Sequence, residues 1–248
     1  RWWRHALRPL VNSTNNLILV NSTNYWDWRE MGMVSPIKDQ RRCAACWAFS
    51  IVANIESHLA IYLNQREVLS EQFLLDCDMS IKNVCSNGSL LQTFGNIVTK
   101  FGGIPRECDY KGYFEGRKEC EFTNETSIVP VVGFTRVKSD ERIMAEYVYK
   151  YGPLSAGINS NSMKKIGLNQ PFVDEPTDEE CSSDPDQMDH AVLIVGYSVY
   201  VNNYGEQIPY WIIKNSWSSN WGDQGFYYLV RGRNACGIAN DVSYAFVN

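Results

Sequence analysis

The feature that most restricts the fold is a change of hydrophobic pattern along the chain. Residues 46–61 repeat apolar side chains at three- and four-residue steps without glycine or proline, which predicts a helix. Ser70 is a suitable N-cap for a short second helix. Strands are predicted from about Val129 onward, around a helix at 140–151, at 129–132, 154–158, 191–197, 210–214 and 226–230. Helices followed by strands indicate an α+β protein of two lobes, with a cleft between them as the natural site.

Composition excludes several classes of protein. The 248 residues are 44% hydrophobic and 21% charged, which is typical of globular proteins and not of disordered ones. A net charge of −5 gives no basic surface for nucleic acid. No apolar run approaches the roughly 18 residues that a membrane helix needs. With only three histidines, no metal site is expected.

Eight cysteines are more than a cytosolic enzyme usually carries. Four Asn-x-Ser/Thr triplets add acceptor sites for N-glycosylation, at Asn12, Asn21, Asn87 and Asn124. Together they predict the secretory pathway, with a lysosomal, endosomal or extracellular destination.

The first 25 residues differ from the rest. They are rich in asparagine and serine, show no sustained period and lack the apolar core of a signal peptide. We expect residues 1–25 to be an N-terminal extension or a pro-segment remnant. The helical lobe is then expected at 26–128 and the strand-rich lobe at 129–248.

Three segments carry reactive chemistry. Cys46 stands at the first turn of the predicted helix, where free N–H groups and the helix dipole favour thiolate. His190 enters a buried strand, and an imidazolium near Cys46 would lower the pKa of the thiol further. Asn215 could fix the imidazole tautomer, as the third member of a triad does.

Each segment also has an ordinary structural explanation. A histidine before an apolar strand is usually structural, and Asn215-Ser216 before a tryptophan is usually a turn. Cys43 and Cys46 have the spacing of a metal knuckle, a redox pair or a disulfide participant. The chain has no second Cys-x-x-Cys for zinc, and residues 33–40 supply no thioredoxin-like context. The coincidence of three motifs in order favours catalysis.

From about Asp27 to the C-terminus, the chain resembles the papain family of cysteine proteases, of the cathepsin L/F type. The motifs that carry the resemblance are Gln40, Cys46-Trp47-Ala48-Phe49-Ser50, 69–72, 74–77, 189–192, 214–217, 221–226 and 235–238. Residues 59–61, 63–65 and 76–78 are most similar to the cathepsins of insect viruses. The resemblance implies a papain-like fold, in which a helical lobe and a β-barrel-like lobe flank the active-site cleft.

The resemblance also implies roles. Cys46 would be the nucleophile of a cysteine endopeptidase, His190 the general acid and base, and Asn215 its orienting partner under Trp217. Gln40 and the Cys46 N–H would bind the oxyanion. Peptide or protein substrates, proteinaceous inhibitors, a monomer and no cofactor are implied as well. His190 follows Cys46 by 144 residues and Asn215 by 169, where about 130–150 is usual, which predicts a loop insertion near 200–207.

The family pattern implies three disulfides, namely Cys43–Cys85, Cys77–Cys120 and Cys181–Cys236. Cys108 is left without a partner. It is expected to be a free buried thiol, with intermolecular pairing as the alternative.

A pocket for the second residue before the cut is implied too. Its walls would be Leu90, Leu91, Gly157 and Met188, with Asp241 as the floor. An acidic floor would accept Arg or Lys, while the apolar walls accept Leu or Phe; in the alternative, Asp241 turns to solvent. The other expected substrate contacts are Gly88, Ser89, Asp189 and Trp217.

Four positions depart from the family pattern, where glycine is usual: Arg41, Ala44, Ser89 and Ser218. None of these changes removes a catalytic group. Two competing hypotheses therefore stay open: a weakened or silent family member that acts as a binding or structural protein, and a disulfide exchanger that uses Cys43 and Cys46.

Overall fold

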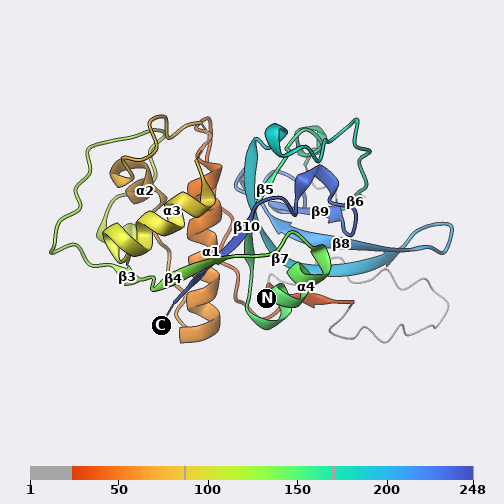
Figure 1. Cartoon of the computed structure of the whole chain (residues 1–248), viewed down its shortest axis with the longest axis horizontal. Coiled ribbons are helices and arrows are strands. Elements are labelled where there is room, and N and C mark those ends of the chain that lie inside the picture. Colours follow the sequence, from red (N-terminus) through yellow and green to blue (C-terminus); the bar gives the residue numbers. More distant parts are fainter. Residues whose placement is uncertain (1–23, 87, 169–170, 248) are drawn as a thin grey trace.

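The computed structural model describes residues 24–86, 88–168 and 171–247. A helical lobe and a strand-rich lobe lie side by side, with helix α1 (Cys46–Leu63) along their boundary (Figure 1). The expected extension at 1–25 lies almost entirely outside the described residues, as do Asn12, Asn21 and Asn87.

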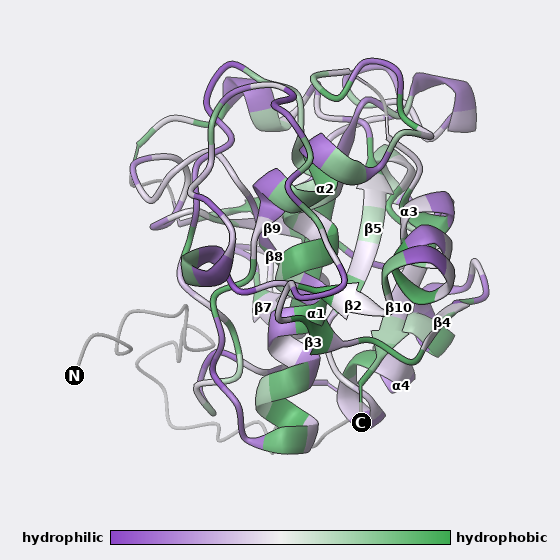
Figure 2. Cartoon of the chain, turned by 90° about the vertical axis from the view of Figure 1, so that its left-hand side faces the viewer, coloured by the Kyte–Doolittle hydropathy of each residue, from purple (hydrophilic) through white to green (hydrophobic). Residues whose placement is uncertain are grey.

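Helix α1 is the centre of the helical lobe, and it confirms the predicted helix. Its first fifteen residues are buried, and Figure 2 shows it mainly in the hydrophobic colour. By length and composition alone it could cross a membrane, contrary to the expectation that no such segment exists. However, 83% of that window is buried inside the protein, which is the usual environment of a core helix.

Two short helices pack beside α1. Helix α2 (Glu71–Cys77) begins at Ser70, whose hydroxyl accepts the Phe73 N–H at 3.1 Å, as the sequence predicts. Helix α3 (Leu90–Asn96) begins at Ser89 and continues into a π-helical turn at Ile97–Phe101. A small antiparallel pair, β2 (Gly103–Ile104) and β3 (Val129–Pro130), completes this lobe.

One eight-stranded sheet builds the other lobe. Its strands follow the order β4-β10-β5-β7-β8-β9-β6, and β1 pairs with β7. The bounds are β1 (Trp26–Asp27), β4 (Gly133–Arg136), β5 (Leu154–Ile158), β6 (Val173–Asp174), β7 (His190–Val201), β8 (Gln207–Lys214), β9 (Phe226–Val230) and β10 (Val242–Phe246). Helix α4 (Glu141–Lys150) lies against this sheet, and 3-10 turns occur at Glu107–Asp109, Met163–Lys165, Pro185–Gln187 and Ala235–Gly237.

Some strands differ in length from the prediction: β7 and β8 are longer, and β3 is shorter. Residues 200–207, where a loop insertion is expected, lie between the two predicted strands and extend the β7–β8 hairpin rather than forming one long loop. Val201 still pairs with Gln207, and only 202–206 form the turn. The predicted strand at 129–132 is also shorter, since β3 ends at Pro130.

Each lobe has its own hydrophobic core, and each core receives a segment from the far end of the chain. Trp28 and Val34 pack in the strand-rich core. Ala245 and Val247 pack in the helical core. The two ends of the chain therefore tie the lobes together, and the division at residue 128 stays a prediction.

The three disulfides are those that the resemblance implies: Cys43–Cys85, Cys77–Cys120 and Cys181–Cys236. Cys46 and Cys108 are free. The expectation of a buried Cys108 is wrong, because it lies in the exposed 3-10 turn Glu107–Asp109.

Candidate active site

Cys46 is the first residue of α1 and only 6% exposed. The loop before it is fixed by the Cys43–Cys85 disulfide and by Gln40, whose N–H donates to Ser216 O at 2.9 Å. The Gln40 side chain is buried. Its Nε2 donates to Cys43 O at 3.1 Å and its Oε1 accepts the Ser216 hydroxyl at 2.7 Å. The amide is thus held rigidly beside the nucleophile loop.

His190 is the first residue of β7 and is also buried. Its Nε2 lies 2.8 Å from Asn215 Oδ1, and the Trp217 ring covers it at a centroid distance of 4.7 Å. Because Asn215 Oδ1 can only accept, Nε2 carries the proton in this pair. Nδ1 is therefore the nitrogen left to exchange a proton with another group.

Burial shifts the pKa of both groups toward the neutral form. Burial raises the pKa of Cys46 to about 11, although the N–H groups of Ala191, Trp47 and Cys46 itself oppose this shift. Burial also lowers the pKa of His190 to about 4, against the opposing bond to Asn215. The N–H groups at the helix start act in the expected direction, toward thiolate, but burial outweighs them.

A cavity of about 110 Å³ opens beside Cys46 and His190. Of the predicted substrate contacts, the structure brings together Gly88, Leu90, Gly157, Met188, Asp189 and Asp241. A β-carbon on Gly157 would lie 3.4 Å from Met188 Cε and 3.6 Å from Asp241 Cβ. The glycine therefore leaves the pocket open between its wall and its floor.

Three predicted contacts lie elsewhere. Ser89 is exposed, and its hydroxyl caps α3 by accepting the Gln92 N–H at 3.3 Å. Leu91 does not line the cavity, and Trp217 covers His190 instead. The structure adds three residues that sequence reasoning did not assign to the pocket: Trp47, Ser86 and Ala191. Trp47 and Ala191 directly follow Cys46 and His190 in the sequence, and this adjacency could have indicated that they line the pocket.

Two carboxylates lie in this pocket in different settings. Burial raises the pKa of Asp241, and Arg136 opposes the shift. Burial also acts to raise the pKa of Asp189, but hydrogen bonds from Lys164 and Ser160 outweigh it and leave that pKa below the ordinary value. Lys164 Nζ lies 2.8 Å from Asp189 Oδ2. Asp189 is thus a paired anion, whereas Asp241 is a half-buried acid that lines the pocket.

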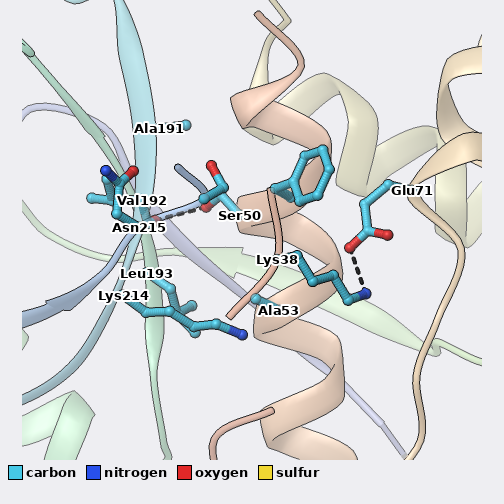
Figure 3. A pocket seen from close by; sticks show the side chains of 11 residues that line it. Lys38, Ser50, Ala53, Glu71, Ala191, Val192, Leu193, Lys214 and Asn215 are labelled. Atoms are coloured by element: carbon cyan, nitrogen blue, oxygen red, sulfur yellow. Dashed lines mark hydrogen bonds and ion pairs between the residues drawn. The ribbon is translucent and has the colours of Figure 1, made fainter. Parts of the chain in front are cut away.

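A second cavity, of about 20 Å³, lies below Asn215 between the lobes. Figure 3 shows Lys38 reaching Glu71 from one side and Lys214 approaching from the strand-rich side. Lys38 Nζ contacts Glu71 Oε1 at 2.6 Å and Glu56 Oε1 at 2.9 Å. Lys214 Nζ donates to Ser35 Oγ at 2.8 Å, and Ser35 in turn donates to Glu56. This interlobe network (Ser35, Lys38, Glu56, Glu71 and Lys214) supports the strand end that carries Asn215.

The described residues hold no group of three or more His, Cys, Asp or Glu side chains placed for a metal ion. A buried cysteine at a helix start, in one pocket with an amide-held imidazole, is the arrangement of a cysteine hydrolase. Residues 22–246 match the model of papain family cysteine proteases. The chain belongs to the papain family of cysteine proteases.

Several relatives are similar over most of this chain. Cysteine proteinase 1 of Dictyostelium discoideum is 36% identical over 96% of this chain and 70% of its own length. Cathepsin F of Drosophila melanogaster is 38% identical over 86% of this chain and 34% of its own. The viral cathepsin of Heliothis zea nuclear polyhedrosis virus is 36% identical over 88% of this chain and 55% of its own. The chain thus spans about a third to just over two thirds of these relatives.

The fold is similar to that of bromelain from Ananas comosus, solved in complex with the inhibitor E64. The TM-score is 0.77 at 29% identity, and the match covers 91% of this chain and 99% of bromelain. The expected papain-like α+β fold of two lobes is confirmed.

Proposed function

We propose that the chain is an endopeptidase in which Cys46 attacks the peptide carbonyl. The observation that carries this proposal is the His190 ring, fixed at Nε2 by Asn215 and covered by Trp217, in the same pocket as the buried thiol. The thiol proton passes to His190 Nδ1, and the sulfur forms a bond to the carbonyl carbon. The N–H of Cys46 and the Gln40 amide stabilise the oxyanion.

The leaving amine then takes the proton from His190, which leaves an acyl-enzyme on Cys46. Water, deprotonated by the neutral imidazole, releases the acid product and restores the thiol. Asn215 keeps Nδ1 turned toward the reacting atoms and accepts from Nε2–H throughout. Burial opposes the thiolate–imidazolium pair, whereas the N–H groups at the start of α1 and the Asn215 hydrogen bond favour it.

Labelling with an irreversible peptidyl thiol alkylator tests this proposal. The expected result is one adduct on Cys46, mapped by peptide mass spectrometry, whose formation parallels the loss of proteolysis. No adduct and no turnover in reducing, mildly acidic buffer would favour the silent binding protein. Disulfide exchange is disfavoured, because Cys43 is paired with Cys85 and leaves Cys46 without a redox partner.

We also propose that the pocket accepts an apolar or a basic residue at the second position before the cut. Leu90 and Met188 supply apolar walls, and the Asp241 carboxylate is the acidic group on the floor. A charge-assisted hydrogen bond from a substrate Arg contributes roughly 1.5–3 kcal/mol, or about tenfold to a hundredfold in kcat/KM.

Asp241→Ala should lower kcat/KM for an Arg substrate at least about tenfold and leave a Leu substrate nearly unchanged. In the wild type the pKa of Asp241 is raised, so its charge, and the advantage of Arg, should fade at a higher pH than for an exposed aspartate. Fluorogenic substrates that differ only at this position measure both effects between pH 4 and 7. Asp178→Ala, at an exposed site, is the control. Equal losses on both substrates would contradict the role of Asp241.

Peptide or protein substrates, proteinaceous inhibitors, a monomeric state and the secretory route belong to the same proposal. Three disulfides support an oxidising compartment. Asn124 lies in an exposed turn, where a glycan can be attached.

A further inference from the structure

Two consecutive arginines lie beside the proposed oxyanion site. Arg41 and Arg42 directly follow Gln40, and both are exposed. Arg41 has a φ of 55°, a left-handed conformation in which a β-carbon is unfavourable. Glycine would adopt this conformation without strain, so the backbone gives no reason for an arginine here. Strain of this kind is often associated with function.

The backbone of this dipeptide is clamped by acidic side chains. Asp39 Oδ1 accepts the Arg41 N–H at 2.8 Å, and Glu115 Oε1 accepts the Arg42 N–H at 2.6 Å. The Tyr113 hydroxyl donates to Gln40 O at 2.8 Å. These contacts hold the main chain and do not bind the guanidinium groups. Neither guanidinium has a hydrogen bond or an ion pair within the part of the chain that the structure describes.

The position of Arg41 and Arg42 next to Gln40 indicates which part of a bound peptide they would meet. The pocket with Leu90 and Asp241 takes residues before the cut, and neither Gln40 nor Trp217 lines it. Those two residues lie together on a flank outside the pocket: Asp39 pairs with Trp217, Gln40 Oε1 accepts the Ser216 hydroxyl, and the Trp217 ring packs on His190. A peptide bound with its earlier residues in the pocket must leave Cys46 over this flank. Its residues after the cut then pass Arg41 and Arg42.

We infer that Arg41 and Arg42 form an anion-binding rim that selects peptides with Asp or Glu at the first two positions after the cut. This inference rests on the proposed peptidase function. Arginine suits the role because its planar fork binds a carboxylate through two parallel hydrogen bonds. The site is exposed, so we expect about a three- to tenfold preference in kcat/KM, weakened by salt.

The test uses two kinds of substrate that share the same residues before the cut. Internally quenched peptides carry Asp, Asn or Lys at the first two positions after the cut, and mass spectrometry verifies the cleaved bond. A coumarin amide has no residue after the cut and reports the basal activity. The wild type should cleave the Asp peptide about three- to tenfold faster than the Asn peptide at pH 6, and Lys should be slowest.

In the double variant Arg41→Gln/Arg42→Gln, the Asp and Asn peptides should become equal while the coumarin amide is cleaved as by the wild type. Raising NaCl from 50 to 500 mM should reduce the wild-type preference in the same direction. Arg142→Gln, on α4, is the matched control and should keep the preference, because that side chain is 90% exposed and its ion-pair partner among the described residues is Asp140. A wild type without Asp preference, or a preference that survives in the double variant, overturns the inference. A wild type that cleaves neither kind of substrate overturns the peptidase proposal and this inference with it.

Discussion

Changing Cys46 to serine is expected to lower kcat for peptide hydrolysis by at least about 10⁴-fold. His190 is a weak base in this cleft, since burial lowers its pKa to about 4. It can accept the proton of a thiol far more readily than that of a hydroxyl, whose pKa is several units higher. Initial rates on a quenched peptide, with the circular dichroism spectrum as a check of folding, measure the effect.

The matched control for this variant is Cys108→Ser. Cys108 is the other free cysteine, but it is exposed and its Sγ lies 3.8 Å from Asp109 Oδ1. We expect a change of about twofold or less in kcat. Comparable losses in the two variants would show that the loss of activity does not depend on which free cysteine is changed, and would contradict the assignment of Cys46.

Local patterns predicted the elements that carry the reactive groups. The apolar period of 46–61 is a local property, and it places Cys46 at the helix start that the structure shows. The apolar run after His190 likewise gives the strand β7, with the histidine as its first residue. The pocket is different, because Gly157 and Asp241 come from segments more than 80 residues apart and meet where the Gly157 N–H donates to Asp241 O at 2.9 Å. Only the family resemblance indicated that pairing.

The state of the nucleophile could not be predicted from the sequence. A cysteine at a helix start suggests a lowered pKa, but the balance depends on how much of the sulfur is withdrawn from water. The lobes bury Cys46 so far that desolvation raises its pKa by more than three backbone N–H groups lower it. The interlobe network could not be predicted from the sequence either. Lys38, Glu56 and Glu71 lie in separate segments, so no sequence spacing indicates that their side chains meet.

The largest stability effect is expected from this network. Lys38→Met should lower the free energy of unfolding by about 3–4 kcal/mol near pH 8, because it leaves the Glu56 and Glu71 carboxylates buried together without their cation. Both glutamate side chains are at most 2% exposed, so water cannot replace Lys38. Urea unfolding of the disulfide-intact protein, followed by tryptophan fluorescence, measures the loss.

The deficit should shrink as the pH falls. Burial already raises the pKa of Glu71 to about 7 from an ordinary value near 4.5, even though Lys38 acts to lower it. A raised pKa in the folded state means that the folded protein binds the proton more tightly than the unfolded chain, so the penalty is present above that pKa and is relieved below it. Without Lys38 the pKa rises further. The difference between variant and wild type should therefore be clearly larger at pH 8 than at pH 5.

The matched control is Lys150→Met, which breaks a pair with Glu146 whose side chains are 55% and 65% exposed. Solvent screens that pair, so the expected loss is about 0.5 kcal/mol or less at either pH. If Lys38→Met cost no more than the control, the glutamates would be relieved by some other cation, and Lys214 is the nearest candidate because its ammonium already reaches Ser35 at 2.8 Å. The double variant Lys38→Met/Lys214→Met would then show the full loss. The network would still join the lobes beneath Asn215, but through Lys214 rather than Lys38.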